Sequence, residues 1–217
     1  NTAVGHRSLA ANTTGGYNTA VGRHTLTNNT TTSNNTAIGN YALDLSTASN
    51  NTAVGYNAMQ TSTTGSSNTA VGAYVLDANT TGAENTSIGY NSLSDNTTGD
   101  KNTAVGKNAL MDVTTGDNNS AIGEDAGASI TTGSNNQCIG HNAGGANSPS
   151  GQITTGSNNY VLGDNSISNL YCADTSISSS DARDKTDIED FTHGLSWIKE
   201  LRPVTYRWDR RTWYGTE

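Results

Sequence analysis

The sequence is poor in charge and in apolar side chains. Asp, Glu, Lys and Arg make up only 14% of the 217 residues, 32% are hydrophobic, and there are one Phe and two Pro. Ordinary globular domains of this length hold more apolar residues, and disordered chains usually carry more charge. The composition therefore fits neither common class, and a low-charge sequence rich in Asn, Thr and Gly suggests internal repeats.

Residues that carry chemistry are scarce as well. The two cysteines, Cys138 and Cys172, form no Cys-x-x-Cys pair and predict no zinc site, so each is expected to fill a small packing position. Acidic pairs are too sparse in the repeats for a glycosidase, and the calcium-binding glycine-rich nonapeptide is absent. We expect no cofactor, no bound metal and no catalytic turnover.

Two further classes of partner are disfavoured. The net charge of −8 argues against nucleic acid and anionic membrane surfaces, which attract basic proteins. No apolar run approaches the length that crosses a bilayer, so membrane insertion is not expected. The sequence opens inside a repeat, and we expect the natural N-terminus to lie upstream, so a missing signal peptide carries no information.

What the sequence does contain is a repeat. A five-residue motif, NTAVG or a close relative, occurs ten times and closes each time on a glycine: Gly5, Gly22, Gly39, Gly55, Gly72, Gly89, Gly106, Gly123, Gly140 and Gly163. Successive glycines lie 17, 17 and 16 residues apart, then five times 17, and finally 23. Ten units at a nearly constant period identify a repeat protein.

Each unit has the same internal pattern. Counted from the Asn of the motif, the third residue is small (Ala, Ser or Cys) in the first nine units, the fourth is Val, Ile or Leu, the fifth is Gly, and the ninth is Leu or Met in the first seven units. A second turn often follows, as in Asn-Thr-Thr-Gly at Asn12 and Asn79. Because Gly and Asn tolerate the positive φ of reversing turns, the unit is predicted to be strand, glycine turn, second short strand, Asn/Gly turn.

Stacked units of this kind make an all-β β-solenoid of about 17-residue coils. About two large apolar side chains per unit, worth roughly 1.5–3 kcal/mol each, barely offset the entropy lost by the backbone. We therefore expect the fourth- and ninth-position rows, for example Val71 and Leu76, to form a core shared between chains in an oligomeric fibre.

The NTAVG unit resembles the head repeats of trimeric bacterial adhesins and similar repeats in phage tail fibres. The resemblance covers residues 1–163, which we assign to a solenoid stalk. It implies a homotrimer of parallel or intertwined chains, whereas the periodicity alone does not fix the number of chains.

Two features of the stalk leave alternatives open. The ninth unit carries six extra residues, around 144–151, which form either a surface loop or a lateral contact with a host glycan or a neighbouring protein. His6, His24 and His141 follow the glycine turn of their units. They are either polar side chains that face the solvent, or histidines that form a ring around the axis of the fibre and bind an ion.

The chain changes character after Gly163. Residues 164–179 alternate enough to be strand-like and are assigned to a β neck. The last 37 residues hold 15 charged residues, as many as the preceding 180, together with all three Trp. Such a shift in composition marks a domain boundary at the start of residues 180–217.

Two elements are predicted inside this last segment. Apolar residues at intervals of three and four between Ile188 and Leu201 predict an amphipathic helix, which Pro203 ends. Alternation from Val204 to Trp208 predicts a half-buried strand. One helix and one strand do not close a core, so residues 180–217 are expected to be the truncated start of an α+β domain.

The same segment resembles a known chaperone family. Ser180, Asp181, Arg183, Lys185 and Ile188, followed by Leu-Arg-Pro-Val-x-Tyr-x-Trp at 201–208, closely resemble the start of the intramolecular chaperone at the C-terminus of phage endosialidase tailspikes and many tail fibres. In that family the chaperone trimerises, brings the β-rich stalk into register and often removes itself. The resemblance covers about the last 38 residues.

The resemblance implies one self-cleavage, between Ser179 and Ser180. Ser180 is then the nucleophile and Lys185 its base, with Asp181 and Arg183 holding the turn. A desolvated lysine takes the proton of a serine hydroxyl, although Asp184 beside it, where many relatives carry an apolar residue, favours the charged lysine. The alternative is that this stretch is a solvated turn capping the helix.

Three functions remain. The first is the stalk of a trimeric phage tail fibre or tailspike, located in the virion and assembled in the host cytoplasm. Its partners are further copies of itself, other tail or fibre proteins, and a host surface glycan or receptor.

The second is a bacterial trimeric surface adhesin, which needs a secretion signal and a membrane anchor outside this sequence. The third is an ice-binding solenoid, which favours a flat Thr-x-Thr face, whereas the threonines here are mostly adjacent at turns. The chaperone start favours the first.

Overall fold

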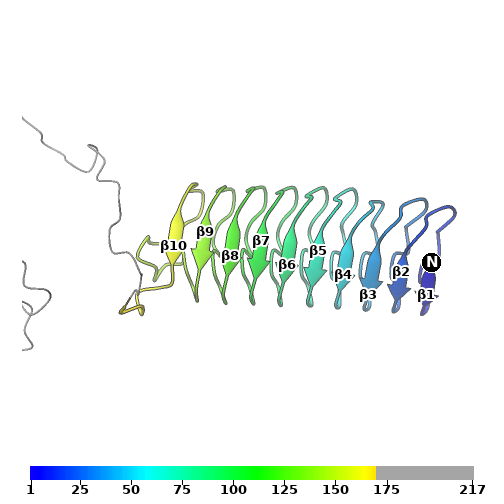
Figure 1. The fold of residues 1–217 in the computed structure, drawn as a ribbon, viewed down its shortest axis with the longest axis horizontal. Coiled ribbons are helices and arrows are strands. Elements are labelled where there is room, and N and C mark those ends of the chain that lie inside the picture. The colour runs from blue at the N-terminus through cyan, green and yellow to red at the C-terminus, as the bar shows by residue number, and fades with distance from the viewer. Residues whose placement is uncertain (170–217) are drawn as a thin grey trace, which may run out of the picture. The chain divides into compact units, whose positions relative to one another are not determined.

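The computed structural model describes residues 1–169, and this part of the chain is an all-β solenoid without a helix (Figure 1). Each coil contributes one strand of three residues. The strands are β1 (Thr2–Val4), β2 (Thr19–Val21), β3 (Thr36–Ile38), β4 (Thr52–Val54), β5 (Thr69–Val71), β6 (Thr86–Ile88), β7 (Thr103–Val105), β8 (Ser120–Ile122), β9 (Gln137–Ile139) and β10 (Tyr160–Leu162). The predicted β-solenoid is confirmed.

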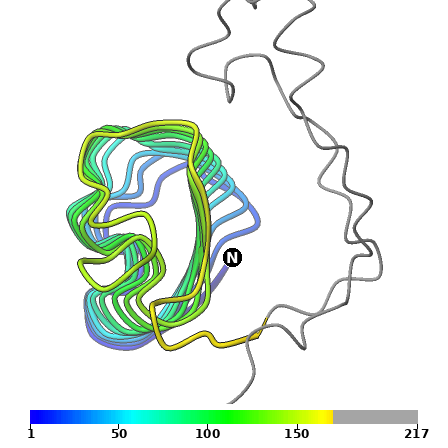
Figure 2. The ribbon, with the colours of Figure 1, turned by 90° about the vertical axis from the view of Figure 1, so that its left-hand side faces the viewer.

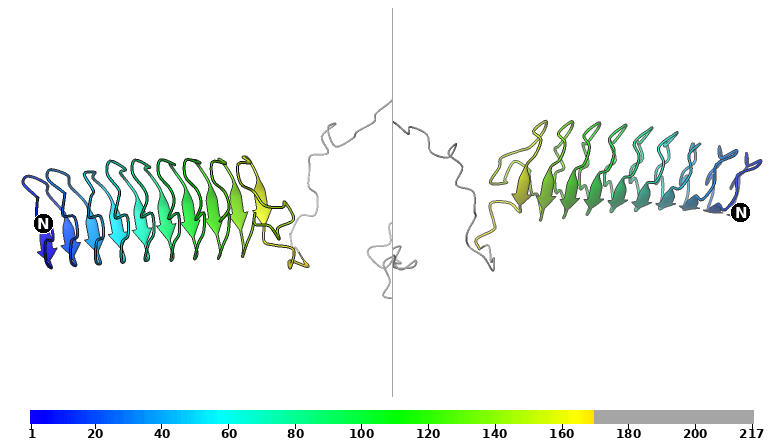
Figure 3. Two further views of the ribbon diagram at one scale, coloured as in Figure 1. Left: turned by 180° about the vertical axis from the view of Figure 1, so that it is seen from behind. Right: turned by 45° about the horizontal axis from the view of Figure 1, so that its top comes forward.

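All ten strands lie in one parallel sheet in chain order, so each coil pairs with the next (Figures 1 and 3). Equivalent residues face each other, as Thr52 faces Thr69 and Val54 faces Val71. The shorter third unit and the longer ninth unit keep this alignment, because Thr36 still pairs with Thr52 and Gln137 with Tyr160. Length differences between units are therefore absorbed in the turns.

The coil contains one strand where the sequence predicted two. After the fifth-position glycine the backbone turns instead of extending, and the seventh and ninth residues take left-handed conformations, as in Asn57 (φ 55°) and Met59 (φ 53°). Left-handed φ costs an L-residue roughly 1–2 kcal/mol. It turns the ninth side chain into the coil, which is why the expected second strand is absent.

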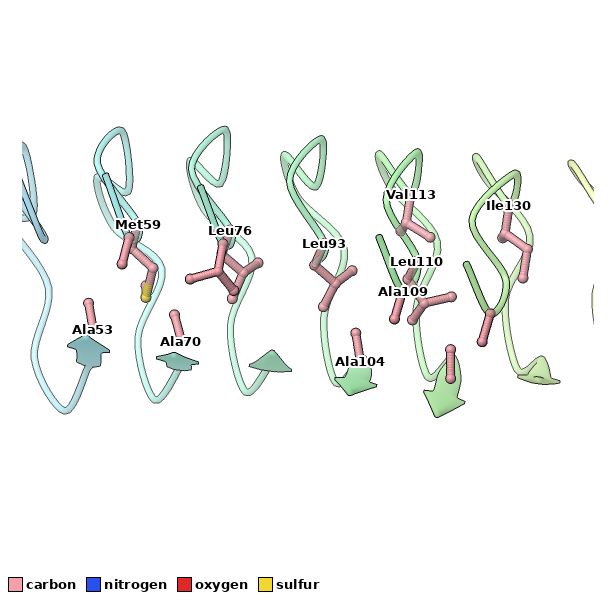
Figure 4. Packing of buried hydrophobic residues seen from close by; sticks show 14 of the residues in the cluster. Ala53, Met59, Ala70, Leu76, Leu93, Ala104, Ala109, Leu110, Val113 and Ile130 are labelled. Carbon is pink, nitrogen blue, oxygen red and sulfur yellow. The ribbon is translucent and has the colours of Figure 1, made fainter. Parts of the chain in front are cut away.

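The core lies inside each coil and is built mainly from the third, eighth and ninth positions. Ala70 on β5 and Leu76 are both fully buried, and Figure 4 shows the alanine row of the strands facing the row of Met59, Leu76, Leu93 and Leu110. Val71 is instead 37% exposed on the outside of the coil. The expectation that the ninth row is shared between chains was therefore wrong, because Leu76 is already enclosed by its own chain.

The last coils fill the same space differently. Gly127 and Gly144 stand at the ninth position, and Ile130 and Ile153 are buried later in the same units. A Cβ at Gly127 would lie 2.7 Å from Cδ2 of Leu110 and 3.2 Å from Cδ1 of Ile130. The isoleucine thus occupies the volume that a ninth-position leucine fills elsewhere, which keeps the core closely packed.

A buried column of asparagines runs along the start of the coils. In nine successive pairs the backbone N–H of one motif Asn donates to the side-chain oxygen of the motif Asn before it, at 2.8 to 3.0 Å. Nine of the side-chain NH2 groups also donate to a carbonyl near the end of their own coil, at 2.7 to 2.9 Å. Each Asn therefore closes its own coil and binds the next one.

The insertion in the ninth unit packs against the end of the solenoid. The carbonyl of Asn147 accepts the backbone N–H of Asn165 at 2.8 Å, Ser148 is buried, and its hydroxyl donates to the Gly163 carbonyl at 3.4 Å. Figure 2 shows this segment, in yellow-green, turning inward across the end of the coil stack. The loop packs on its own chain while Pro149 and Ser150 stay exposed, which fits the surface-loop alternative. A lateral contact with a host glycan or a neighbouring protein stays a prediction.

The residues after β10 leave the repeat as predicted. Asp164 to Ile167 form a turn closed by the Ile167 N–H on the Asp164 carbonyl at 3.2 Å. No strand follows in 164–169, and the rest of the predicted neck lies outside the described residues. Within residues 1–169 no helix is long and apolar enough to cross a membrane.

Candidate functional site

The outward face of the sheet is the first candidate for interaction. Side chains alternate along a strand, so the buried third residue leaves the second and fourth positions facing out. The fourth-position residues are apolar and 37 to 56% exposed at seven of the ten coils: Val4, Ile38, Val71, Ile88, Ile122, Ile139 and Leu162. The parallel register aligns the fourth positions of successive coils into one apolar row, which we call the valine–isoleucine row.

A threonine row runs beside it. The second position is Thr in the first seven strands, and each of the first six pairs with the threonine of the next coil. Ser120, Gln137 and Tyr160 take the position in the last three strands. The prediction that the threonines lie mostly at turns was incomplete, because one in each of the first seven coils lies in a regular Thr-x-Val/Ile face.

Aromatic rings line the corner that follows the glycine turn. His6, His24 and Tyr41 form one tract, with ring centroids 5.6 and 5.1 Å apart. Tyr56, Tyr74 and Tyr90 form a second, with centroids 5.3 and 6.0 Å apart. All six stand at the sixth or seventh position of six consecutive coils, and we call them the aromatic column.

The N-terminal tract carries cationic groups. The Arg23 guanidinium lies 5.3 Å from the centroid of the Tyr41 ring, and its Nη1 donates to the Tyr41 hydroxyl at 2.7 Å. Desolvation, followed by the charges of Arg23 and Arg7, lowers the pKa of His24 from its ordinary value. His24 is therefore uncharged at neutral pH and offers a donor and an acceptor beside two cations.

The last coils place charged residues at the same corner. Nζ of Lys107 lies 2.9 Å from Oε1 of Glu124, and Nδ1 of His141 lies 3.3 Å from Oδ2 of Asp164. The hydrogen bond from Lys107 lowers the pKa of Glu124 and raises that of the lysine. The Lys107–Glu124 pair is exposed on both sides, so it is worth little in stability. The solenoid therefore tolerates aromatic, cationic and anionic residues alike at this corner.

The predicted histidine and cysteine roles have different outcomes. His6 and His141 are exposed at the corner, as expected for outward decoration. Among residues 1–169, no group of three or more His, Cys, Asp or Glu is placed to hold a metal ion. Cys138 is buried at the small third position of β9, and burial raises the pKa of its thiol to about 11, so its packing role is confirmed. Cys172 lies outside the described residues.

The comparisons with known proteins concern the other end of the chain. Residues 180–215 match the family described as chaperone of endosialidase. No curated protein and no solved structure shows a significant match to the chain. The family match supports the C-terminal chaperone segment that the sequence pattern indicates.

The catalytic residues expected in the chaperone segment are not placed by the structure. Ser180, Asp181, Arg183 and Lys185 all lie outside the described residues, as do the predicted helix and strand that follow them. They fall within the stretch that matches the family. Their proposed roles stay predictions.

Sequence reasoning missed four members of the aromatic column. It singled out histidines after the glycine turn and passed over Tyr41, Tyr56, Tyr74 and Tyr90, which occupy the same positions. Aligning the units by their closing glycine and comparing sixth and seventh positions would have found them. The alternation between these two positions hid the column in the linear sequence.

Proposed function

We propose that this chain is the shaft of a homotrimeric phage-type fibre whose C-terminal segment is a trimerisation chaperone. The observation that carries the proposal is the family match at residues 180–215, directly after a solenoid with an exposed apolar row along its whole length. Three copies, each turning its valine–isoleucine row toward a common axis, would bury that row.

The energetics of the row favour association. Full burial of a Val or Ile is worth roughly 1.5–3 kcal/mol, so covering the exposed part of each is worth about 1 kcal/mol. Ten coils then give about 10 kcal/mol per chain, which is comparable with the cost of association. An apolar row in register from β1 to β10 also explains the need for a chaperone, because a slip by one coil still covers nine of the ten coils.

In this proposal the fibre is part of a virion, is assembled in the host cytoplasm, and serves attachment to a host surface. The chaperone segment aligns the three chains and is then released by cleavage between Ser179 and Ser180. Ser180 attacks the carbonyl carbon of Ser179 while Lys185 takes its proton. The peptide C–N bond between Ser179 and Ser180 breaks as an ester forms to the Ser180 oxygen, and the freed amino group takes up the proton. One water then hydrolyses the ester, which leaves a carboxylate on Ser179 and restores the Ser180 hydroxyl.

The trimer is tested by analytical ultracentrifugation of the full chain, which should sediment at three times the chain mass of 22.5 kDa. Val71→Asp with Ile88→Asp should abolish the trimer, since both side chains are exposed in the single chain. Thr64→Asp with Thr81→Asp, at exposed turn positions away from the sheet, is the matched control. A folded monomer of the unmodified chain would contradict the proposal.

One observation favours a second function. The in-register threonine row on the parallel sheet meets part of the requirement for an ice-binding solenoid. The neighbouring row is apolar instead of a second threonine row. Thermal hysteresis of the purified chain decides this point, and its absence removes the alternative. A bacterial adhesin remains the other alternative, and a secretion signal and anchor in a longer sequence would support it.

A further inference from the structure

The aromatic column is not required by the fold. At the sixth position Asn40, Lys107 and Glu124 replace the aromatic residue, and at the seventh Asn57 and Asn108 do so. The backbone is the same in both cases, because φ is 56° at Tyr74 and 55° at Asn108. Six aromatic residues in six consecutive coils therefore have a cause other than the geometry of the coil.

The column has the form of a repeating platform. Its rings are 5.1 to 6.0 Å apart within each tract, which follows the strand spacing of about 4.8 Å that stacks the coils. Tyr56 and Tyr90 are 44% and 50% exposed. A linear polymer with a short repeat, lying along the solenoid axis, is the ligand that such a surface matches.

The chemistry of the rings selects the kind of polymer. Tyrosine presents an apolar ring and a polar hydroxyl, and histidine a ring with two nitrogens. Sugar rings have the complementary arrangement, with C–H groups on their faces and hydroxyls around their rim. The electron-rich face of an aromatic ring attracts such C–H groups in the way it attracts cations, although more weakly.

The distribution of charged residues along the solenoid favours an acidic polymer as the ligand. Residues 1–76 contain Arg7 and Arg23 and a single acid, Asp44, whereas residues 77–169 contain nine acids and two lysines. The N-terminal half is thus the part of the rod that does not repel anions. Arg23 lies over the Tyr41 ring, which brings a cation to the column itself.

We propose that the aromatic column binds an acidic polysaccharide lying along the solenoid, with the tyrosine and histidine rings contacting the sugar rings and Arg7 and Arg23 facing the carboxylates. This inference rests on the proposed function only for its biological meaning, as the contact through which the fibre attaches to a host surface. The binding itself is a property of the solenoid.

Titration calorimetry with three polymers tests the binding. Polygalacturonate has sugar rings and carboxylates, dextran has sugar rings alone, and poly-L-glutamate has carboxylates alone. The full chain should bind polygalacturonate at least tenfold more tightly than either of the others. Equal affinity for poly-L-glutamate would reduce the effect to non-specific charge and overturn the proposal, as would no binding of polygalacturonate.

The matched variants use residues that the solenoid already has at these positions. Tyr41, Tyr56, Tyr74 and Tyr90 are all replaced by Asn, which occurs naturally at the sixth position (Asn40) and at the seventh (Asn57). This variant should lose at least tenfold in affinity for polygalacturonate. The control is Tyr17→Asn, on an 86% exposed tyrosine outside the column, whose position is occupied by Asn34 in the next coil. Unchanged binding by the fourfold variant contradicts the proposal.

Sedimentation of the same samples separates this inference from the proposed function. A chain that binds polygalacturonate as a monomer would support the column and contradict the trimer. A trimer that does not bind would do the opposite. If the fourfold variant dissociates while Tyr17→Asn does not, the rings belong to the contact between copies and the polysaccharide site is wrong.

Discussion

The side-chain oxygen of Asn51 accepts the backbone N–H of Asn68, one coil later, at 2.9 Å, and both residues are buried. Asn51 also donates its NH2 to the Gly65 carbonyl at 2.9 Å. One side chain therefore satisfies one backbone group of its own coil and one of the next. A buried backbone group left without a partner costs about 1–3 kcal/mol, which makes this column a main source of order in a fold with so few large apolar residues.

Replacing Asn51 by Ala should therefore destabilise the solenoid by about 2–5 kcal/mol, because two buried backbone groups lose their partners at once. Urea unfolding followed by circular dichroism measures the loss. Asn28→Ala is the control, since Asn28 is exposed and its side chain makes none of the hydrogen bonds found in residues 1–169. Equal stability of the two variants would mean that the buried column contributes little.

Gly72→Ala should prevent the coils from stacking at that point. Gly72 has φ +142°, and a Cβ there would lie 2.1 Å from the carbonyl oxygen of Gly89, which is backbone and cannot move aside. The expected result is a loss of soluble folded chain. Gly16→Ala is the matched control, because a Cβ at Gly16 meets no atom within 4 Å. Normal folding of Gly72→Ala would show that the coil spacing is softer than the structure indicates.

The folding stability of the solenoid should depend on pH through the ionisation of Asp77. Desolvation by burial, with a further contribution from Asp95, raises the pKa of Asp77 above its ordinary value. The folded state then holds the proton more tightly than the unfolded state, so stability falls as pH rises through the raised pKa. Asp77→Asn should unfold at higher urea than the unmodified chain at neutral pH. The difference should vanish below the ordinary aspartate pKa of about 3.9. A gain that persists in acid would assign the effect to packing instead of ionisation.

A longer chain with the chaperone domain completed should cut itself once, between Ser179 and Ser180. Electrophoresis of the expressed protein detects the two fragments, and Ser180→Ala and Lys185→Ala should each leave one uncut band. The reaction should require the trimer, because packed neighbours are needed to desolvate Lys185 against the charge of Asp184. A cut that survives both substitutions would indicate an external protease. A single uncut band of the unmodified chain would leave the chaperone as a permanent cap.

Much of the fold follows from the sequence alone. The ten closing glycines determine the number of coils, and their recurrence with the motif Asn determines the register, because the same turn residues must stack for each coil to repeat the last. The shift in composition near residue 180 and the Ser-Asp-x-Arg-x-Lys start indicate the chaperone segment, which the family match supports. Each of these features is a pattern of residue types along the chain, so it can be recognised without knowing which residues meet in space.

Only the tertiary structure decided which apolar row lies inside. Val71 and Leu76 are both apolar, and neither composition nor period distinguishes them. The left-handed backbone at Leu76 (φ 50°) turns its side chain inward over Ala70, and strand alternation then places Val71 outside. The asparagines show the same limit. The sequence shows them only as the first residue of each motif, and the stacking of coils buries them, because each side-chain oxygen accepts a backbone N–H of the neighbouring coil, as Asn51 does from Asn68.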